Sequence, residues 1–410
     1  MNFYFPHFAG NEYALAIYQG TRTDTIQSGK IGPDGRLSIQ LPADKTDYRG
    51  IVAWSLKGGG GMNFVLAGEN ISISCTEKIP SDNNILYTGS PENTLLREYS
   101  SKQSLLFSKT DVIFRGRELY RNDKNLFAVF DREAEQLNNS YQQFMQTVVE
   151  SKTYVSDYLR INSFLSGIAS RLYAPGEENL RGEDLRRFVA NDLNMDVLYT
   201  SGRWNHAISA TFDLFPDKKD FAGAMVNNLK RTRSPQVFIA LATDLVTICE
   251  QFGWPEAEDI IVYYLMESGR IQNPQGPLRV AFGMYKVKSG TKALPVKGIN
   301  KLSNSILIFY ESGCGNCQTQ IDELKKHYAS LQTQGLKVIS ISSDMDSTVF
   351  KSFSQTFPWP DRLCDYKGFE GENFINYSIY GTPTLFLIDK NGMIVGRYAR
   401  LEEMKDRVKI

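Results

Sequence analysis

Two cysteines at positions 314 and 317 are the side chains whose type and spacing most directly suggest chemistry. The motif Cys314-Gly-Asn-Cys317 stands between an apolar, strand-like run at residues 306–310 and a helical pattern that begins at once. Two thiols three residues apart on a first helical turn are close enough to form a disulfide. The N–H groups and the dipole at the helix start also stabilise a thiolate on the first of them. Thiol–disulfide exchange requires this arrangement, because one thiolate attacks a disulfide and the second thiol resolves the mixed disulfide.

The helix after the motif predicts a different environment for each thiol. Apolar residues recur along it at spacings of three and four and form one stripe: Ile321, Leu324, Tyr328 and Leu331. Cys317 lies four residues before the first of these and falls on the stripe, whereas Cys314 lies at the mouth of the helix. We therefore expect Cys314 to be the exposed nucleophile and Cys317 the shielded resolving thiol. A C-x-x-C pair is also half of a zinc site, but the strand-then-helix context favours redox chemistry.

A second motif lies downstream and contains a proline in an unusual place. The sequence Gly381-Thr-Pro-Thr384 introduces an apolar run at residues 385–388, and Asn391-Gly392 separates that run from another at residues 393–395. Asn-Gly between two apolar runs predicts a tight hairpin. A proline at the start of a strand cannot donate to the ladder, so Pro383 is expected to have a special position.

These motifs together resemble the thioredoxin fold, specifically the TlpA/ResA-like thiol–disulfide oxidoreductases, over roughly residues 290–410. In that family the C-x-x-C pair faces a cis-proline, and the residue before this proline offers its backbone to the substrate. The resemblance implies catalytic roles for Cys314 and Cys317, substrate-binding roles for Thr382 and Pro383, and a cis bond between the last two. It also implies a redox-active disulfide that needs no cofactor or metal. A protein disulfide would be the substrate, and an upstream thiol electron donor would regenerate the pair.

Three positions depart from the family pattern. Thioredoxins usually carry Trp immediately before the first cysteine, where this chain has Gly313. Many carry a buried Asp six residues before that cysteine, where this chain has Ile308, and ResA-like proteins have a Glu at the position of Gln320. Neither familiar carboxylate is therefore present to take the proton of the second thiol. Asp322, Glu323 or a water is expected to substitute; otherwise exchange is slow or tuned to a particular substrate.

Composition limits the remaining possibilities. A chain of 410 residues exceeds one ordinary core, so two or three domains are expected. Lys+Arg and Asp+Glu both number 46, and this balance argues against nucleic acid as a partner. No apolar stretch approaches the ~18 residues of a membrane span, and residues 2–6 do not resemble a signal peptide. The family resemblance favours a periplasmic or cell-envelope protein in which Met1 replaces a removed leader; a cytoplasmic location stays open.

The other cysteines and two histidines are weaker candidates for chemistry. Cys75 lies in an alternating run, Cys249 in a helical pattern, and Cys364 before Asp-Tyr, so each is expected to be a small buried or half-buried residue. A zinc site is disfavoured because no second close cysteine pair exists; its ligands would be Cys314, Cys317, Cys364 and His327. His206 has no ligand spacing and is expected at the surface.

The chain divides by pattern into four segments. Residues 1–90 alternate in short strands and predict an antiparallel β-sandwich, similar to the small β-domain of unknown function that precedes thioredoxin-like domains in anaerobic Gram-negative bacteria. The glycine run at residues 58–61 lacks a following Lys-Ser/Thr, which favours a hairpin loop over a phosphate cradle. Residues 91–285 have helical periodicity, residues 286–303 read as a linker or a packed connecting arm, and residues 304–410 form the α/β thioredoxin-like domain.

The resulting hypothesis is a multi-domain thiol–disulfide oxidoreductase of the cell envelope, most simply a disulfide reductase. The N-terminal β-domain and the helical middle would position or recognise the substrate. One alternative is a binding or scaffold protein with a degenerate thioredoxin fold, which the missing carboxylate and Trp favour slightly. A thiol peroxidase of the AhpC/TSA group is a weaker alternative, because the Pro-x-x-x-Thr-x-x-Cys pattern expected for that chemistry is absent around Cys314.

Overall fold

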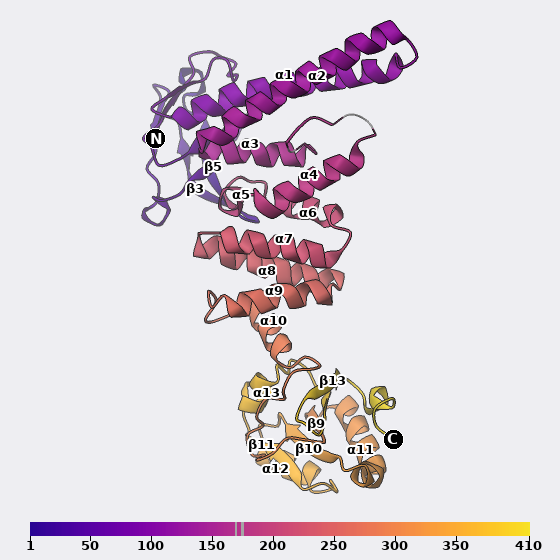
Figure 1. Ribbon diagram of the computed structural model, residues 1–410. Helices are drawn as coiled ribbons and strands as arrows, with labels where there is room; N and C mark the ends of the chain where they lie inside the picture. Colours follow the sequence, from indigo (N-terminus) through magenta and orange to yellow (C-terminus); the bar gives the residue numbers. More distant parts are fainter. Residues whose placement is uncertain (169, 174–175) are drawn as a thin grey trace. The chain divides into compact units, whose positions relative to one another are not determined.

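The structure is a computed structural model that describes residues 1–168, 170–173 and 176–410. The chain divides into two compact units, Met1–Ile261 and Val262–Ile410. The first unit contains two β-sheets followed by helices, and the second contains one five-stranded sheet with its own helices (Figure 1). The expected multi-domain class, with β-structure first, helices next and an α/β fold last, is therefore confirmed.

The N-terminal region forms two four-stranded sheets, ordered β3-β2-β5-β6 and β4-β1-β7-β8. The strands are β1 (Asn2–Tyr4), β2 (Glu12–Gln19), β3 (Arg22–Lys30), β4 (Arg36–Ser38), β5 (Gly50–Leu56), β6 (Gly61–Leu66), β7 (Ser72–Ser74) and β8 (Leu86–Thr88). Leu15 and Ile17 of β2 share a core with Phe3 of β1 and Phe64 of β6, so the two sheets pack against each other. Residues 58–60 of the glycine run lie in the predicted hairpin turn between β5 and β6, and Gly61 begins β6.

One pairing in this region is parallel, unlike the antiparallel prediction. β1 pairs with β4 in the antiparallel direction and with β7 in the parallel direction. A parallel pair needs a long crossover, and here the strands of the other sheet lie between β1 and β7 in the sequence. Short strands with turn residues between them do not reveal such a non-local pairing.

Helices α1 to α10 follow the sheets in the described part of the chain. They are α1 (Pro91–Leu119), α2 (Lys124–Ser151), α3 (Tyr154–Leu165), α4 (Glu178–Asn191), α5 (Met195–Tyr199), α6 (Trp204–Leu214), α7 (Lys218–Arg231), α8 (Pro235–Phe252), α9 (Pro255–Glu267) and α10 (Gly276–Lys286). Ser90 caps α1 by accepting a hydrogen bond from the N–H of Asn93 at 3.4 Å. The Asn93 amide also exchanges two hydrogen bonds of 2.8 and 2.7 Å with the backbone of Val65, which fastens α1 to β6.

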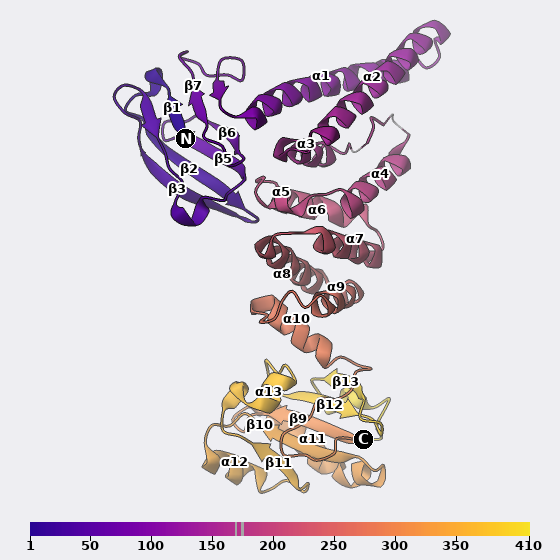
Figure 2. The same ribbon diagram turned by 60° about the vertical axis from the view of Figure 1, so that its left-hand side comes forward.

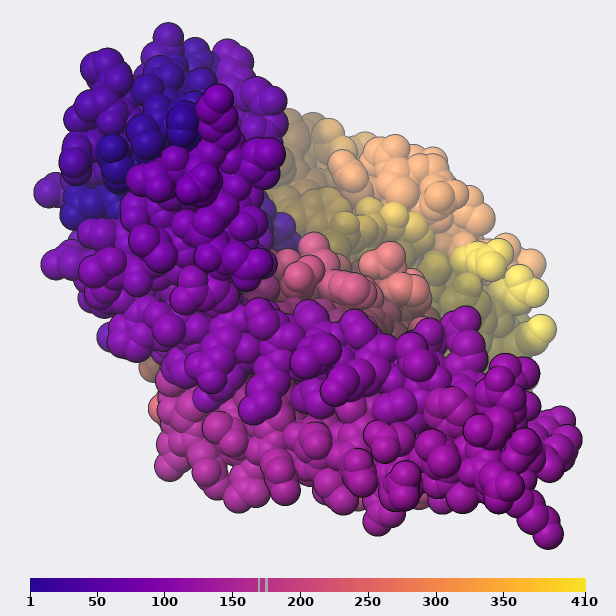
Figure 3. Space-filling view, turned by 90° about the horizontal axis from the view of Figure 1, so that it is seen from above, coloured from indigo at the N-terminus to yellow at the C-terminus, as the bar shows by residue number. Residues whose placement is uncertain are grey.

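α1 and α2 pack along each other as a long antiparallel hairpin (Figure 2). In the space-filling view this hairpin forms a continuous ridge of the surface (Figure 3). Asp123 begins the returning helix, because its carboxylate accepts hydrogen bonds from the N–H groups of Asn125 and Leu126. The hairpin is therefore closed by a local cap that the sequence encodes.

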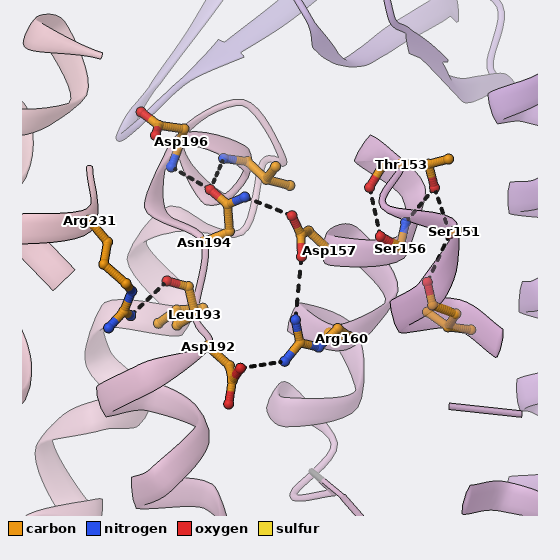
Figure 4. A network of polar contacts seen from close by, with 12 residues as sticks. Ser151, Thr153, Ser156, Asp157, Arg160, Asp192, Leu193, Asn194, Asp196 and Arg231 are labelled. Carbon is orange, nitrogen blue, oxygen red and sulfur yellow. Dashed lines mark hydrogen bonds and ion pairs between the residues drawn. The ribbon is translucent and has the colours of Figure 1, made fainter. Parts of the chain in front are cut away.

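A network of charged and amide side chains joins α3, α5, α7 and the loop between α4 and α5 (Figure 4). Arg160 of α3 pairs with Asp192 at 3.1 Å and with Asp157 at 3.5 Å. Asn194, the N-cap of α5, donates to Asp157 at 2.7 Å. Arg231 of α7 donates to a backbone carbonyl of the same loop at 3.3 Å. These contacts satisfy polar groups where three helices and the α4–α5 loop meet, and so they fix the positions of the helices relative to one another.

The second unit contains the sheet β11-β10-β9-β12-β13. Its strands are β9 (Ser305–Tyr310), β10 (Lys337–Ser342), β11 (Asp361–Cys364), β12 (Thr384–Ile388) and β13 (Ile394–Tyr398), and its helices after α10 are α11 (Gly315–Thr333), α12 (Ser347–Ser354) and α13 (Glu372–Asn376). β9, β10 and β11 are parallel, whereas β12 and β13 run antiparallel to their neighbours. This is the predicted α/β thioredoxin-like fold, and Asn391-Gly392 lies in the predicted turn between β12 and β13.

Apolar cores cover both faces of this sheet. On one face Ile306 and Ile308 of β9 pack with Ile321 and Leu324 of α11. On the other face Leu307 and Phe309 of β9 pack with the segment around α13. Residues of β9 alternate between the two cores, so the strand is buried on both sides, as a central parallel strand must be. Short 3-10 helices occur elsewhere in the two units, at Pro6–Phe8, Ala43–Lys45, Gly368–Glu370 and Leu401–Met404.

The segment at residues 286–303 belongs to the second unit and lies packed against its sheet. The N–H of Gly290 donates to the carbonyl of Ile394 at 2.8 Å, and the N–H of Ile394 donates to the carbonyl of Thr291 at 2.8 Å. Val287 and Val296 are buried in the same core as Phe309. The sequence had left open a mobile linker or a packed arm, and these contacts describe a packed arm along the edge of β13.

None of the helices in the described part of the chain combines the length and the apolarity that crossing a membrane requires.

Candidate active site

Cys314 is the N-cap residue of α11 and is partly exposed. Its Sγ accepts a hydrogen bond from the N–H of Cys317 at 3.3 Å. An N–H group at a helix start interacts more strongly with a thiolate than with a thiol, because the helix dipole and the donor both favour negative charge there. The first cysteine is therefore partly accessible and lies at a helix start, where the sequence predicts the nucleophile.

Cys317 lies in a different environment one helical turn later. It is fully buried in the core beneath α11, among side chains such as Ile321 and Leu324. Burial, aided by a hydrogen bond with Cys314, raises the pKa of the Cys317 thiol to about 11. The second cysteine therefore stays protonated and shielded while the first is exposed, which is the predicted division between the resolving and the attacking thiol.

The cis-proline loop meets the cysteine pair because β9 and β12 are neighbours in the sheet. Thr384, the first residue of β12, pairs with Phe309 near the end of β9. The Thr382–Pro383 peptide bond is cis, as predicted. The Cys314 thiol donates to the carbonyl oxygen of Thr382 at a distance of 3.7 Å between Sγ and O. The structure thus brings Cys314, Cys317 and Thr382 with its following proline to one place.

Asp344 is a buried carboxylate beside this site that the sequence interpretation did not select. It follows β10 and accepts hydrogen bonds from the N–H and the hydroxyl of Ser312, at 3.1 and 2.5 Å, and from the Ser342 hydroxyl at 2.6 Å. Gln318 of α11 donates to the Ser312 carbonyl at 2.9 Å. The loop that leads to Cys314 is therefore held from both sides. The sequence signal for Asp344 is its position just after an apolar strand. The carboxyl ends of the parallel strands β9 and β10 lie at the same edge of the sheet, and the loop to Cys314 begins there.

The two carboxylates expected to substitute, Asp322 and Glu323, lie on the outer side of α11. Asp322 is exposed and pairs with Lys325 at 3.2 Å, and Glu323 lies 3.5 Å from His327. Since the buried stripe of α11 contains Cys317, these side chains face away from the second thiol. Gln320, at the family's glutamate position, is buried and its Oε1 accepts a hydrogen bond from the N–H of Leu401 at 2.8 Å, so it holds the C-terminal segment.

The remaining cysteines occupy the environments that the sequence predicts. Cys75 and Cys249 are buried, and Cys364 is partly exposed, as Cys314 is, with its thiol 3.1 Å from the carbonyl of Asp344. His206 is exposed. Within residues 1–168, 170–173 and 176–410, no group of three or more His, Cys, Asp or Glu side chains is arranged to hold a metal ion.

Comparisons with known proteins agree with this geometry. Residues 292–397 match the model of the AhpC/TSA family. The chain is 26% identical over 89 residues to the thiol-disulfide oxidoreductase ResA of Bacillus thuringiensis subsp. konkukian, a match that covers 22% of this chain and 50% of ResA. The same values describe its match to ResA of Bacillus cereus. The chain thus spans about half the length of the curated relatives it matches.

Similar solved structures each cover less than a third of this chain. One is a thiol-disulfide oxidoreductase from Bacteroides fragilis, with 22% identity, a TM-score of 0.24, and coverage of 27% of this chain and 84% of that chain. Another is a thioredoxin-like protein from Parabacteroides distasonis, with 18% identity, a TM-score of 0.28, and coverage of 30% of this chain and 96% of that chain. The strand order shows a thioredoxin-like fold in the C-terminal region, and this region is similar to the AhpC/TSA family and to the ResA thiol-disulfide oxidoreductases.

Cys314 is expected to be alkylated faster than the other four thiols when the reduced protein is treated briefly with iodoacetamide at neutral pH. It is the accessible sulfur that accepts a helix-start N–H, whereas burial raises the pKa of both the Cys249 and the Cys364 thiol. Mass spectrometry of the modified peptides measures the order of labelling. Preferential labelling of Cys75 or Cys249 would contradict the assignment of the nucleophile.

The stability of the reduced protein is expected to fall as the pH rises from about 9 to about 11. The unfolded chain releases the Cys317 proton near its ordinary pKa, while the folded protein retains this proton up to a pKa of about 11. The folded state therefore binds more protons in this window, and the free energy of unfolding decreases with pH. The part due to Cys317 is about 2–3 kcal/mol.

Urea unfolding of reduced wild type and of Cys317→Ser, at the two ends of this pH window, isolates that part. The difference in the free energy of unfolding between the two proteins should shrink as the pH rises. A difference that stays constant across the window would show that the Cys317 thiol is not buried in the reduced protein.

Proposed function

We propose that this protein is a thiol–disulfide oxidoreductase that reduces disulfide bonds in other proteins. The observation that carries the proposal is the unequal pair: Cys314 is accessible at a helix start and touches the Thr382 carbonyl, while Cys317 is buried directly behind it. The similarity to ResA supports the same reaction class. The pair itself supplies both electrons, so the proposed reaction uses no cofactor or metal.

The reaction proceeds in two exchange steps. The Cys314 thiolate attacks one sulfur of the substrate disulfide, a Cys314–substrate disulfide forms, and the other substrate sulfur leaves as a thiolate. Cys317 then loses its proton and attacks Sγ of Cys314, which releases the second substrate sulfur and leaves the Cys314–Cys317 disulfide. The substrate gains two electrons and two protons overall. An upstream dithiol donor returns the pair to the reduced form by the reverse exchange.

The backbone beside Pro383 is the proposed docking element. The carbonyl of Thr382 lies against the nucleophile and ahead of β12, so an extended substrate segment can add its backbone hydrogen bonds there. The large first unit would recognise or position the protein that carries the disulfide. A cell-envelope location fits a reaction on protein disulfides, because disulfides persist in oxidising compartments.

Insulin reduction with dithiothreitol as electron donor tests this function on the full chain. Catalysis that disappears in Cys314→Ser supports the oxidoreductase. If wild type does not catalyse insulin reduction although Cys314 and Cys317 can still form a disulfide, the result would favour the binding or scaffold protein. Consumption of hydrogen peroxide at a rate above that of insulin reduction would instead favour the thiol peroxidase that the AhpC/TSA match leaves as the other candidate.

A further inference from the structure

Gly283 lies within α10 at a point where the helix has no room for a side chain. A Cβ added there would lie 2.0 Å from Oγ and 3.0 Å from Cβ of Ser378. The backbone of Gly283 has no positive φ, so the helix itself does not require glycine at this position. Glycine in a helix interior lowers stability relative to alanine. The close approach of α10 to Ser378 is therefore the structural reason for this residue.

Ser378 begins the loop that ends in the cis-proline. Ser378 is buried and adopts a positive φ of 50°, a backbone conformation that residues other than glycine rarely adopt. Its N–H donates to the carbonyl of Ile375 at 3.1 Å, and the next N–H, of Ile379, donates to the carbonyl of Phe374 at 2.9 Å. The loop at residues 378–383 therefore leaves α13 through a tight turn, and α10 rests directly on that turn.

The packed arm after α10 holds the same turn from a second side. The Tyr377 hydroxyl donates to the carbonyl of Leu294 at 2.6 Å. The Asn373 side chain accepts from the N–H of Lys297 at 2.8 Å and donates to the carbonyl of Lys297 at 3.3 Å. These bonds connect the arm to α13 and to the residue immediately before Ser378. The turn is thus fixed by contacts that are far apart in the sequence.

A further contact fixes α10 to the strand beside this loop. Met284, the neighbour of Gly283, contacts the guanidinium of Arg397 in β13. The same guanidinium lies 5.8 Å from the ring centroid of Phe386, which is buried in the core of the sheet. In both ribbon views α10 ends at the side of the unit that carries α13 and β13 (Figure 1, Figure 2). α10 is therefore tied to the sheet as well as to the turn.

We propose that α10 is a buttress that sets the position of the substrate-docking loop at residues 378–383, with Gly283 as the positioning residue at the contact. The proposal rests on the proposed function, because the loop ends at Thr382, whose carbonyl touches Cys314. Gly283 touches neither thiol. It acts through Ser378, and a shift of this contact moves the docking backbone while the Cys314–Cys317 pair stays on α11.

Gly283→Ala is the direct test in the full chain. The added methyl group overlaps Oγ of Ser378 and crowds its Cβ, so the hydroxyl must turn away and this buried residue must give way by a few tenths of an ångström. A misplacement of docking groups by about 1 Å can reduce catalysis by two orders of magnitude, and a smaller shift reduces it less. We expect kcat/KM for insulin to fall about tenfold, chiefly through KM, by this argument. Oxidation of the Cys314–Cys317 dithiol by glutathione needs no extended docking. Its equilibrium constant in the variant should therefore stay within about twofold of the wild-type value.

Two further variants separate positioning from general damage. Ser378→Gly removes the two atoms that crowd the new methyl group and accepts the positive φ, and the Tyr380 hydroxyl then lies at an ordinary contact distance of 3.9 Å. The double variant Gly283→Ala/Ser378→Gly should therefore regain most of the wild-type kcat/KM. Gly223→Ala is the matched control, because Gly223 also lies inside a helix and a Cβ built on it meets nothing within 4 Å. This control should behave as wild type.

The outcomes distinguish this inference from the proposed function. If wild type reduces insulin and Gly283→Ala does so equally well, the positioning role of α10 is contradicted while the proposed function stands. A loss in Gly283→Ala that Ser378→Gly does not reverse, or that comes with an equally large change in the glutathione equilibrium constant, also overturns it. Failure of wild type itself to reduce insulin would overturn the proposed function first.

Discussion

Cys317→Ser is expected to accumulate a stable mixed disulfide between Cys314 and a protein substrate. The accessible sulfur of Cys314 still attacks, but the buried position behind it no longer carries a thiol that can release the product. Turnover of insulin should fall to the uncatalysed background. Non-reducing electrophoresis and mass spectrometry of the cross-linked peptide measure the trapped species.

Two variants serve as controls for this result. Cys314→Ser should trap almost nothing, because the remaining thiol is fully buried and burial raises its pKa to about 11. Cys364→Ser removes a thiol of the same unit whose hydrogen-bond partner is the Asp344 carbonyl, and it should keep both turnover and the resolving step. Equal trapping by Cys314→Ser and Cys317→Ser would contradict the assignment of Cys314 as the attacking thiol and Cys317 as the resolving thiol.

Asp344→Ala is expected to lower the stability of the second unit by about 3 kcal/mol and to loosen the loop before Cys314. The change leaves the buried N–H and hydroxyl of Ser312 and the hydroxyl of Ser342 without their shared acceptor. An unsatisfied buried donor costs about 1–3 kcal/mol, and bonds to a charged group lie at the upper end of such values. Hydrogen exchange of β9 and α11 in the full chain measures the local stability.

Matched carboxylate variants make this second prediction specific. Asp344→Asn keeps one acceptor oxygen and should cost about half as much. Asp346→Ala removes an exposed N-cap from α12, where the carboxylate accepts from the N–H groups of Thr348 and Val349, and should cost about 1 kcal/mol without changing exchange in β9. Exchange rates in β9 that are the same in all three variants would show that Asp344 does not hold the loop.

The sequence was sufficient for features whose causes are local. Ser90 and Asp123 cap the helices that follow them, and the alternation of β2 places Leu15 and Ile17 on one face. The apolar stripe of α11 distinguishes Cys317 from Cys314, because helical periodicity alone sets which side chain faces the core. The cis bond before Pro383 also followed from the family pattern, since its motif is short and contiguous.

Contacts between distant segments were decided only by the tertiary structure. Gln320 and Leu401 are 81 residues apart, and Ser312 and Asp344 are 32 apart, so neither pairing leaves a periodic signal. The same holds for the parallel pairing of β1 with β7 and for the approach of Gly283 to Ser378. Periodicity, caps and turn residues report which side of an element is buried and where it ends. Which buried polar group meets which partner depends on the packing of whole elements, and here that packing determines the support around the cysteine pair.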